Sequence, residues 1–433
     1  TQNLLVRSQA LYPIELQALI VNIFNYIVLS LFDINCKKTY FKMNKKSTEV
    51  AIVAAVRTPI GTYKGSLKNI KAHKLGSIVI KEVIKRAKIN KSEINEVILG
   101  QVLTAGTGQN SARQASINAG LPKHVSSYLI NQVCGSSLRS VISGFQTIKL
   151  QEAKYVISGG QENMSIAPHA LLYRNDKKLS ENMLIDTMIY DGLMDAFNNY
   201  HMGVTAENVA EKFKISRDEQ DEFAFKSQKK TQQAQEKNKF ENELVKINFD
   251  GAFLDVDEHP RKDLKIEDLR KLKTVFKDNG TVTPGNASGI NDGAAAVLLT
   301  SLEEAEKKSL KPLAKIVSWA SVGIEPSLMG LGPIDAIKLA LKKSNWKMDE
   351  VDLFEINEAF ASQSIAVIKQ LKIDETKVNV NGGAIALGHP IGASGTRILV
   401  TLIHEMLKQN KKKGCASLCI GGGMGIAICI EKI

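Results

Sequence analysis

Cys134 has the surroundings of a reactive thiol. It lies in the run Asn131-Gln-Val-Cys-Gly-Ser-Ser-Leu-Arg139, where an expected strand turns into an expected helix. Backbone N–H groups and the helix dipole at such a turn favour a thiolate, and small neighbours let a thioester carbonyl approach the backbone. Taken alone, however, a free cysteine is more often buried and inert.

One histidine lies in an unusual loop. His389 is part of Gly382-Gly-Ala-Ile-Ala-Leu-Gly-His-Pro-Ile-Gly-Ala-Ser-Gly395, in which glycine provides tight turns and Pro390 fixes the chain after the imidazole. A structural histidine is the alternative. The run does not match a phosphate-binding loop, because neither G-x-x-x-x-G-K-[ST] nor G-x-G-x-x-G occurs. We therefore expect a rigidly held imidazole base.

Two further polar groups follow expected strands. Cys419 ends the strand Ala416 to Ile420 before Gly421-Gly-Gly-Met-Gly425, and Asn357 comes directly after the strand Val351 to Ile356. Ligands of open α/β sheets bind at the carboxyl ends of such strands. A capped helix start is the alternative for Asn357. These residues should share one sheet edge with Cys134.

The elements that must position these residues alternate between strands and helices. The first expected strand is Val50 to Val56, followed by an amphipathic helix carrying Leu75, Ile78, Val79, Val83 and Ile84. Further strands are expected at Glu96 to Val102 and at Lys154 to Ser158, the latter closed by Gly159-Gly160. Helices are expected from about Ile334 to Lys343 and from about Ser394. This pattern predicts an α/β fold.

The two ends of the chain repeat one plan. Glu93-Ile94 lies 257 positions before Glu350-Val351, and the run 134–139 lies 258 positions before 392–397. Such constant spacing predicts two βαβ-rich halves related by duplication. The N-terminal half comprises residues 43–162 and 290–313, and the C-terminal half comprises 314–433. The polar, Met-rich segment 163–289 is expected to be an inserted substrate-binding loop domain.

Composition excludes several classes of protein. The 433 residues are 44% hydrophobic and carry a formal charge of +12. The excess lysine is spread along helices without interleaved aromatics, which favours a solvated surface over nucleic-acid binding. A positively charged entrance that attracts an anionic substrate is the alternative. Five scattered cysteines without a C-x-x-C motif predict no disulfide framework and no metal site, and favour a reducing, cytoplasmic compartment.

The first 42 residues stand apart from the rest. The chain begins at Thr1 and its first methionine is Met43, directly before the first expected strand. The apolar run 18–32 is short for a membrane span and lacks a secretory cleavage site. We expect a non-native or disordered leader and no stable membrane association. A targeting leader, mitochondrial in a eukaryotic source, is the alternative.

From about residue 48 to its end, the sequence resembles the thiolase family, most closely the short-chain biosynthetic acetoacetyl-CoA thiolases. The resemblance is carried by the four motifs around Cys134, Asn357, His389 and Cys419, in this order. It implies a layered α/β/α/β/α arrangement. The implied activity is reversible condensation of two acetyl-CoA molecules to acetoacetyl-CoA and CoA through an acetyl-cysteine. CoA is then substrate and product, no cofactor is needed, and a homotetramer, a dimer of dimers, is expected.

The resemblance also implies roles for residues. Cys134 matches the acylated nucleophile, His389 its base, Cys419 the second acid/base, and Asn357 the residue that holds a water. The backbone N–H groups of Cys134 and Gly421 match the oxyanion hole. Residues that match CoA contacts are His201, Met202, Arg261, Ser288, Ala359 and Phe360. Asp268 departs from the pattern, because bacterial relatives often have serine there, and this puts one CoA contact in doubt.

Three alternatives remain beside this activity. A broad 3-ketoacyl-CoA thiolase of fatty-acid degradation shares the motifs, although the run Tyr200-His-Met-Gly203 favours the acetoacetyl branch. A decarboxylating ketoacyl synthase would need a second histidine in place of Cys419. A non-catalytic thiolase-like subunit is disfavoured because all four reactive positions are intact. The direction of the reaction and the acyl-chain limit stay open.

Overall fold

The computed structural model describes residues 48–171, 184–249 and 251–433, of which Glu49–Ile433 form one unit. The expected leader lies outside the described residues. The N-terminal half contains β1 (Val50–Arg57), β2 (Gly61–Thr62), α2 (Ala72–Ala87), η1 (Lys91–Glu93), β3 (Glu96–Gly100), α3 (Ser111–Asn118), β4 (Ser126–Ile130), α4 (Ser136–Lys149), β5 (Val156–Asn163), β10 (Asn291–Ser301) and α9 (Leu302–Lys307).

The C-terminal half repeats this order with its own elements. It contains β11 (Ala314–Gly323), η3 (Pro326–Leu331), α10 (Gly332–Ser344), β12 (Leu353–Ile356), α11 (Ala361–Leu371), η4 (Glu375–Lys377), α12 (Ala384–Leu387), α13 (Ser394–Lys408), β13 (Lys413–Ile420) and β14 (Met424–Lys432). The segment between β5 and β10 forms β6 (His169–Leu171), β7 (Leu184–Asp186), α5 (Thr187–Gly192), α6 (Met202–Phe213), α7 (Arg217–Glu236), β8 (Ile247–Phe249), β9 (Ala252–Leu254) and α8 (Ile266–Arg270).

Strand pairing confirms the duplication. The strands of the N-terminal half lie in the order β4-β3-β5-β10-β1, and those of the C-terminal half in the order β12-β13-β14-β11. The position of β4 is taken in the second half by a single parallel bridge from Val378 to Phe354 of β12. Short antiparallel pairing of β1 with β11, from Val50↔Ile316 to Ile52↔Ala314, joins both sets into one hydrogen-bonded path.

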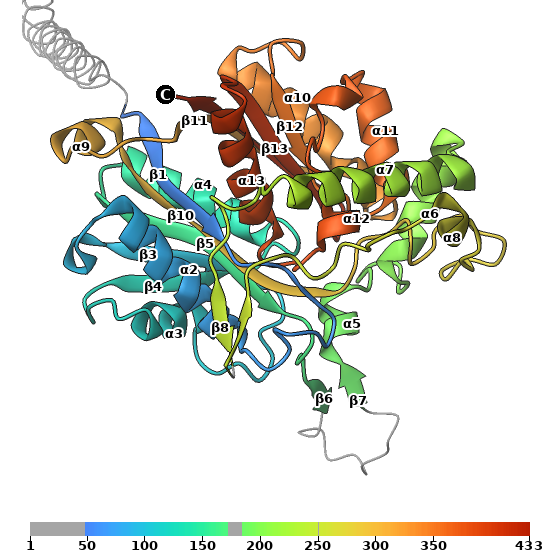
Figure 1. The fold of residues 1–433 in the computed structure, drawn as a ribbon, viewed down its shortest axis with the longest axis horizontal. Helices are drawn as coiled ribbons and strands as arrows, with labels where there is room; N and C mark the ends of the chain where they lie inside the picture. The colour runs from blue at the N-terminus through green and yellow to red at the C-terminus, as the bar shows by residue number, and fades with distance from the viewer. Residues whose placement is uncertain (1–47, 172–183, 250) are drawn as a thin grey trace, which may run out of the picture. The chain divides into compact units, whose positions relative to one another are not determined.

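Helices cover the strands in layers, as expected. Helices α2 and α3 lie on the outer side of the first set of strands, and α10 and α11 on the outer side of the second (Figure 1). Helices α4 and α13 pack on each other between the two sets. Strands covered on both faces need continuous apolar sequence, which explains why all eight residues of β1 are buried.

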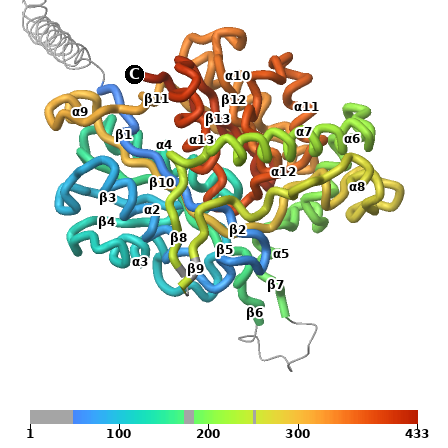
Figure 2. Tube along the Cα trace, in the orientation of Figure 1, coloured from blue at the N-terminus to red at the C-terminus, as the bar shows by residue number. Residues whose placement is uncertain are grey.

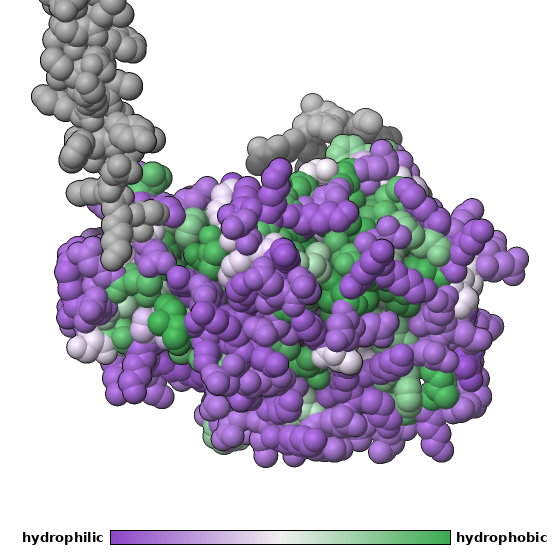
Figure 3. Space-filling view, turned by 90° about the horizontal axis from the view of Figure 1, so that it is seen from above, coloured by the Kyte–Doolittle hydropathy of each residue, from purple (hydrophilic) through white to green (hydrophobic). Residues whose placement is uncertain are grey.

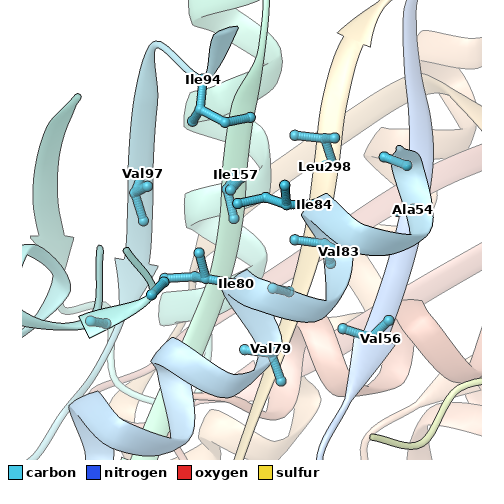
Figure 4. Packing of buried hydrophobic residues seen from close by; sticks show 14 of the residues in the cluster. Ala54, Val56, Val79, Ile80, Val83, Ile84, Ile94, Val97, Ile157 and Leu298 are labelled. Carbon is cyan, nitrogen blue, oxygen red and sulfur yellow. The ribbon is translucent and has the colours of Figure 1, made fainter. Parts of the chain in front are cut away.

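In the outer core, the apolar face of helix α2 that the sequence pattern predicts packs against the strands. Its Ile80, Val83 and Ile84 point at Ile157 of β5 and Leu298 of β10 (Figure 4). These side chains recur every three or four residues and so form one apolar stripe along the helix. In contrast, α13 is buried on nearly all sides because it is a middle layer.

Small residues let the two middle helices meet at their N-terminal ends. A Cβ on Gly395 of α13 would lie 2.6 Å from the backbone N of Leu138 in α4, so only glycine fits there. The Ser137 hydroxyl accepts a hydrogen bond from the Thr396 N–H at 2.9 Å, and the Thr396 hydroxyl donates to the Ser137 carbonyl. This contact brings the turn that precedes each helix close to the other.

The predicted strand Lys154 to Ser158 ends earlier than the observed strand β5. The glycines at 159 and 160 were expected to close the strand, but β5 continues to Asn163. They lie inside the strand because other backbone passes very close: a Cβ on Gly160 would lie 2.3 Å from the Gly392 carbonyl oxygen. The second glycine run does end its strand, since β13 stops at Ile420.

The inserted segment and the surface complete the description. Helix α7 runs across α11 and α12 of the C-terminal half, next to α8 (Figure 2). The face seen in Figure 3 is mostly hydrophilic, with hydrophobic residues gathered near its middle. None of the helices in the described ranges is long and apolar enough to cross a membrane. The exact domain boundaries given above stay predictions.

Candidate active site

A cavity of about 380 Å³ gathers nearly all of the predicted site residues. It lies where the turn after β4, the end of β13, the loop before α13 and the inserted segment meet. Asn357 does not line the cavity but lies directly behind His389. The predicted site residues in the cavity wall are Cys134, His201, Met202, Arg261, Ser288, Ala359, Phe360, His389, Cys419 and Gly421.

The turn that carries Cys134 is tightly held. Val133 has a φ of 45°, an unusual conformation for a β-branched residue. The Ser136 hydroxyl donates to the Val133 carbonyl at 2.6 Å and accepts from the Gln132 N–H at 2.9 Å. These bonds stabilise the strained backbone and leave the half-buried Cys134 thiol facing the cavity.

The surroundings of Cys134 act on its pKa in opposite directions. Burial raises its pKa to about 11. The N–H groups of Gly421 and of Cys134 itself oppose this by hydrogen bonding to the sulfur, as a turn at a helix N-terminus should, while the charge of Glu162 adds to the increase. Desolvation therefore outweighs the backbone N–H groups, and a base is needed to form the nucleophile.

The loop that carries His389 is fixed through its backbone. The His389 N–H donates to Oδ1 of Asn291 at 2.9 Å, and Asn291 begins β10 of the other half. Gly388 has a φ of 105°, and a Cβ there would lie within 2.7 Å of the Asn291 amide group. Glycine before the histidine is thus required by both conformation and space.

Hydrogen bonding assigns the tautomer of His389. Nδ1 lies 2.6 Å from Oγ of Ser394, and the single proton of that hydroxyl is donated to the Pro390 carbonyl at 2.9 Å. Ser394 can then only accept from the imidazole, so Nδ1 carries the proton. Nε2 then carries the lone pair and accepts a long hydrogen bond from the Nδ2 group of Asn357 at 3.4 Å.

Burial keeps this imidazole neutral. His389 is 5% exposed, and desolvation together with the charge of Arg397 lowers its pKa to about 3. A neutral imidazole with an unprotonated Nε2 can accept a proton from a thiol in the same cavity. Asn357 is fully buried, and its Oδ1 atom has no hydrogen-bond partner among the described residues.

Cys419 belongs to the C-terminal half and lines the same cavity. It is 1% exposed at the end of β13 and packs among apolar residues that include Met202, Ala359 and Phe360. Burial, followed by the negative charge of an ionised Cys134, raises the pKa of Cys419. The thiols of Cys134 and Cys419 line the same cavity. Cys419 therefore rests as a thiol that can release and recover a proton.

The remaining predicted residues form the wall and mouth. His201 stacks on Phe276 with 4.5 Å between ring centroids, and its Nδ1 accepts from the Gly203 N–H at 3.0 Å. The Ser288 N–H donates to the Ala359 carbonyl at 2.9 Å. This bond joins the inserted segment to the loop after Asn357. Arg261 is exposed and brings a positive charge to the cavity.

Asp268 lies away from this wall. It is exposed in the first turn of α8, where its Oδ2 accepts from the Lys265 N–H at 3.1 Å, and it is absent from the cavity lining. The doubt that the sequence raised about Asp268 therefore concerns a residue outside the cavity.

Sequence reasoning missed four residues that hold or line the site. Asn291 and Ser394 orient His389, and His259 lines the cavity with a pKa that burial lowers to about 4. Glu162, fully buried at the end of β5, accepts hydrogen bonds from the backbone of the His389 loop. A charged residue at the end of an apolar strand was the available signal for Glu162.

The described ranges contain no group of three histidine, cysteine, aspartate or glutamate side chains that could hold a metal ion.

Comparison with known proteins gives consistent matches over the folded chain. The family model "Thiolase, N-terminal domain" matches residues 50–303, and "Thiolase, C-terminal domain" matches residues 310–432. The chain is 52% identical over 389 residues to an acetyl-CoA acetyltransferase of Paracoccus denitrificans, covering 89% of this chain and 100% of the relative. It is 50% identical over 396 residues to the cytosolic acetyl-CoA acetyltransferase of Rattus norvegicus, covering 90% and 100%.

A solved structure agrees with these matches. The crystal structure of the Bacillus anthracis acetyl-CoA acetyltransferase superimposes with a TM-score of 0.87 at 43% identity, covering 89% of this chain and 99% of that one. The family models and the solved structure together cover both halves of the folded chain. The chain belongs to the thiolase family.

Proposed function

We propose that this chain is an acetyl-CoA C-acetyltransferase that condenses two acetyl-CoA molecules to acetoacetyl-CoA and CoA, reversibly, through an acetyl group on Cys134. The relatives from Paracoccus and rat carry this activity in their names. The observation that carries the mechanism is the shared cavity wall of Cys134, His389 and Cys419. The substrate-binding residues are those that the sequence predicted.

In the first half-reaction, Cys134 becomes acetylated. Nε2 of neutral His389 takes the thiol proton, and the sulfur attacks the carbonyl carbon of the first acetyl-CoA. The negative oxygen that develops is met by the N–H groups of Cys134 and Gly421, both of which point to the Cys134 sulfur. CoA leaves with a proton from Cys419, which burial has kept as a thiol.

In the second half-reaction, Cys419 acts as a base. Its thiolate removes an α-proton from the second acetyl-CoA, and the resulting enolate oxygen is stabilised by His389 and by a water held on Asn357. The enolate carbon attacks acetyl-Cys134, and collapse of the adduct releases acetoacetyl-CoA and the Cys134 thiolate. The unpartnered Oδ1 of buried Asn357 supports a role for this residue in holding water.

The proposal extends to assembly and location. β4 is an end strand of the sheet, and its outward side includes Tyr128, which is 38% exposed. An exposed strand edge is a natural pairing site for a second copy, and this supports a homo-oligomer, which we propose to be a tetramer. We propose a cytoplasmic location, because the rat relative is named as cytosolic.

Trapping and substrate choice test this function. Incubation with radiolabelled acetyl-CoA should label the wild type and not Cys134→Ala, and thiolysis should be faster with acetoacetyl-CoA than with a long-chain 3-ketoacyl-CoA. Cys36 lies outside the described ranges, so peptide mapping must place the label on Cys134. An unlabelled wild type would refute the mechanism, and faster long-chain thiolysis would favour the degradative 3-ketoacyl-CoA thiolase.

A further inference from the structure

Glu162 and Ile420 occupy matching positions in the two halves. Helices α4 and α13 begin 258 positions apart, and the residues of β5 and β13 that face these helices match at the same spacing. This spacing also places Cys134 opposite Gly392. The two halves therefore exchange contacts: Ile420 packs against Gly135 of the Cys134 turn, and Glu162 contacts the Gly392 turn.

The carboxylate of Glu162 binds backbone alone. Oε2 accepts from the Gly392 N–H at 2.9 Å and from the Val102 N–H at 2.9 Å, and Oε1 accepts from the Leu103 N–H at 3.3 Å. The side chain is fully buried and forms no ion pair with any residue that the structure describes. Three N–H groups compensate its charge, and they come from two separate loops. Glu162 thus ties the catalytic turn of one half to the strand edge of the other.

The bond to Gly392 bears directly on His389. Only Pro390 and Ile391 separate the two residues, and the turn closes with the Ala393 N–H donating to the Pro390 carbonyl at 2.8 Å. Gly392 has no room to move toward Glu162, because a Cβ on it would lie 2.6 Å from Oε2 and 2.8 Å from Cα of Gln101. The imidazole is therefore positioned from both ends of its turn, by Asn291 before it and by Glu162 after it.

Burial raises the pKa of Glu162 to about 7, and the charge of Asp292 adds to the increase. Hydrogen bonds from the backbone of Val102, Leu103 and Gly392 oppose this increase, because they stabilise the carboxylate.

We propose that Glu162 is a positioning residue: its carboxylate holds the Gly392 turn, and with it His389, in place. This proposal rests on the proposed function only for its kinetic readout, because the reactivity of the Cys134 thiol can be measured without any acetyl-CoA.

Two variants test this role. Glu162→Gln keeps an oxygen that can accept from Gly392 and Val102, and it loses only the bond from the Leu103 N–H, which an NH₂ group cannot accept. Glu162→Asp withdraws the carboxylate by one methylene from Gly392. The matched control is Glu207→Gln, because Glu207 is also a buried carboxylate that accepts from two backbone N–H groups, those of Thr281 and Val282.

The first measurement is the rate of Cys134 alkylation by iodoacetamide at neutral pH, followed by peptide mass spectrometry. Glu162→Asp should react several-fold more slowly than wild type, because a displaced His389 takes the thiol proton less readily. Glu162→Gln and Glu207→Gln should react at nearly the wild-type rate. An unchanged rate in Glu162→Asp would overturn the positioning role, and this result does not depend on acetyl-CoA.

The second measurement is the rate of acetyl transfer at saturating acetyl-CoA. Glu162→Asp should lose about 10-fold or more in kcat with little change in KM, while Glu162→Gln stays within a few-fold of wild type. Equal losses in both variants, or none in Glu162→Asp, would overturn the positioning role. If the wild type itself transfers no acetyl group, the proposed function fails instead, and the alkylation rates still decide the positioning role.

Discussion

The turn before α4 and the turn before α13 have the same backbone plan but different side chains. Ser136 and Ser394 occupy matching positions, and each hydroxyl donates to a carbonyl of its own turn, at 2.6 and 2.9 Å. In the first turn the thiol of Cys134 stands where the second has Gly392. In the second, the Ser394 hydroxyl also accepts from His389.

This difference teaches how a duplicated fold becomes asymmetric. Both halves provide a strand end and a helix turn at one edge, and the chemistry depends on which position received a reactive side chain. The proposed nucleophile lies on a turn of the N-terminal half, and the proposed second acid/base lies on a strand end of the C-terminal half. Gly392, which matches Cys134, has no such role and is instead held by Glu162.

The largest expected effect concerns the end of strand β13, which carries Cys419. Cys419→Ala should lower the rate of condensation by roughly 10²- to 10⁴-fold, because no base remains for the α-proton, while Cys134 should still accept an acetyl group. The measurement is acetoacetyl-CoA formation beside radiolabelled acetylation of the enzyme. Cys415→Ala is the control, since Cys415 is buried on the same strand outside the cavity. Because Cys419 also protonates the leaving CoA in the proposed mechanism, acetylation of Cys419→Ala is expected to be slower. Failure of this variant to become acetylated at all would contradict the division of roles.

A second prediction compares the two serines. Ser394→Ala should lower kcat by about 10-fold or more, because the Nδ1–H group of His389 loses its acceptor and the tautomer is no longer fixed. Ser136→Ala removes the matching hydroxyl without touching the imidazole and should act mainly on stability. Steady-state kinetics and thermal unfolding of both variants provide the test. A kcat loss as large in Ser136→Ala would show that the hydroxyls only stabilise their turns.

The smallest predicted effect concerns the contact between the two middle helices. Gly395→Ala should reduce the free energy of unfolding by roughly 1–3 kcal/mol, because its Cβ would overlap the backbone of Leu138 in α4. Gly323→Ala is the matched control, since no atom lies within 4 Å of a Cβ built there. Urea unfolding measures both. Equal stability of the two variants would mean that α4 and α13 can move apart at Gly395 without a loss of unfolding free energy.

Much of this arrangement was predictable from the sequence. The apolar runs located the buried strands, and the constant spacing of 257 and 258 positions showed that two halves repeat one plan. Strand ends at one sheet edge then predicted that Cys134, Cys419 and the loop of His389 would meet. The reason is general: periodicity and repeat spacing are local properties, and the right-handed order of strands and helices leaves few ways to join them.

Other features were not predictable because they depend on contacts between distant segments. Glycines 159 and 160 resembled a strand end, and only the approach of Gly392 shows why they lie inside β5. Glu162 and Asn291 look like ordinary polar residues until the other half provides their partners, more than 90 positions away. The net effect of the surroundings on the pKa of Cys134 was not predictable, because the depth of burial cannot be read from neighbouring residues.

The sequence by itself therefore determined the family and the duplicated α/β plan, and it predicted the reactive groups, since each is encoded in residue types and their spacing. The tertiary structure decided the protonation state of these groups. Packing of α4 against α13 buries Cys134, Cys419 and His389 in one cavity, and burial keeps the thiols protonated and the imidazole neutral. Desolvation is a property of the folded neighbourhood, and so only the fold could set it.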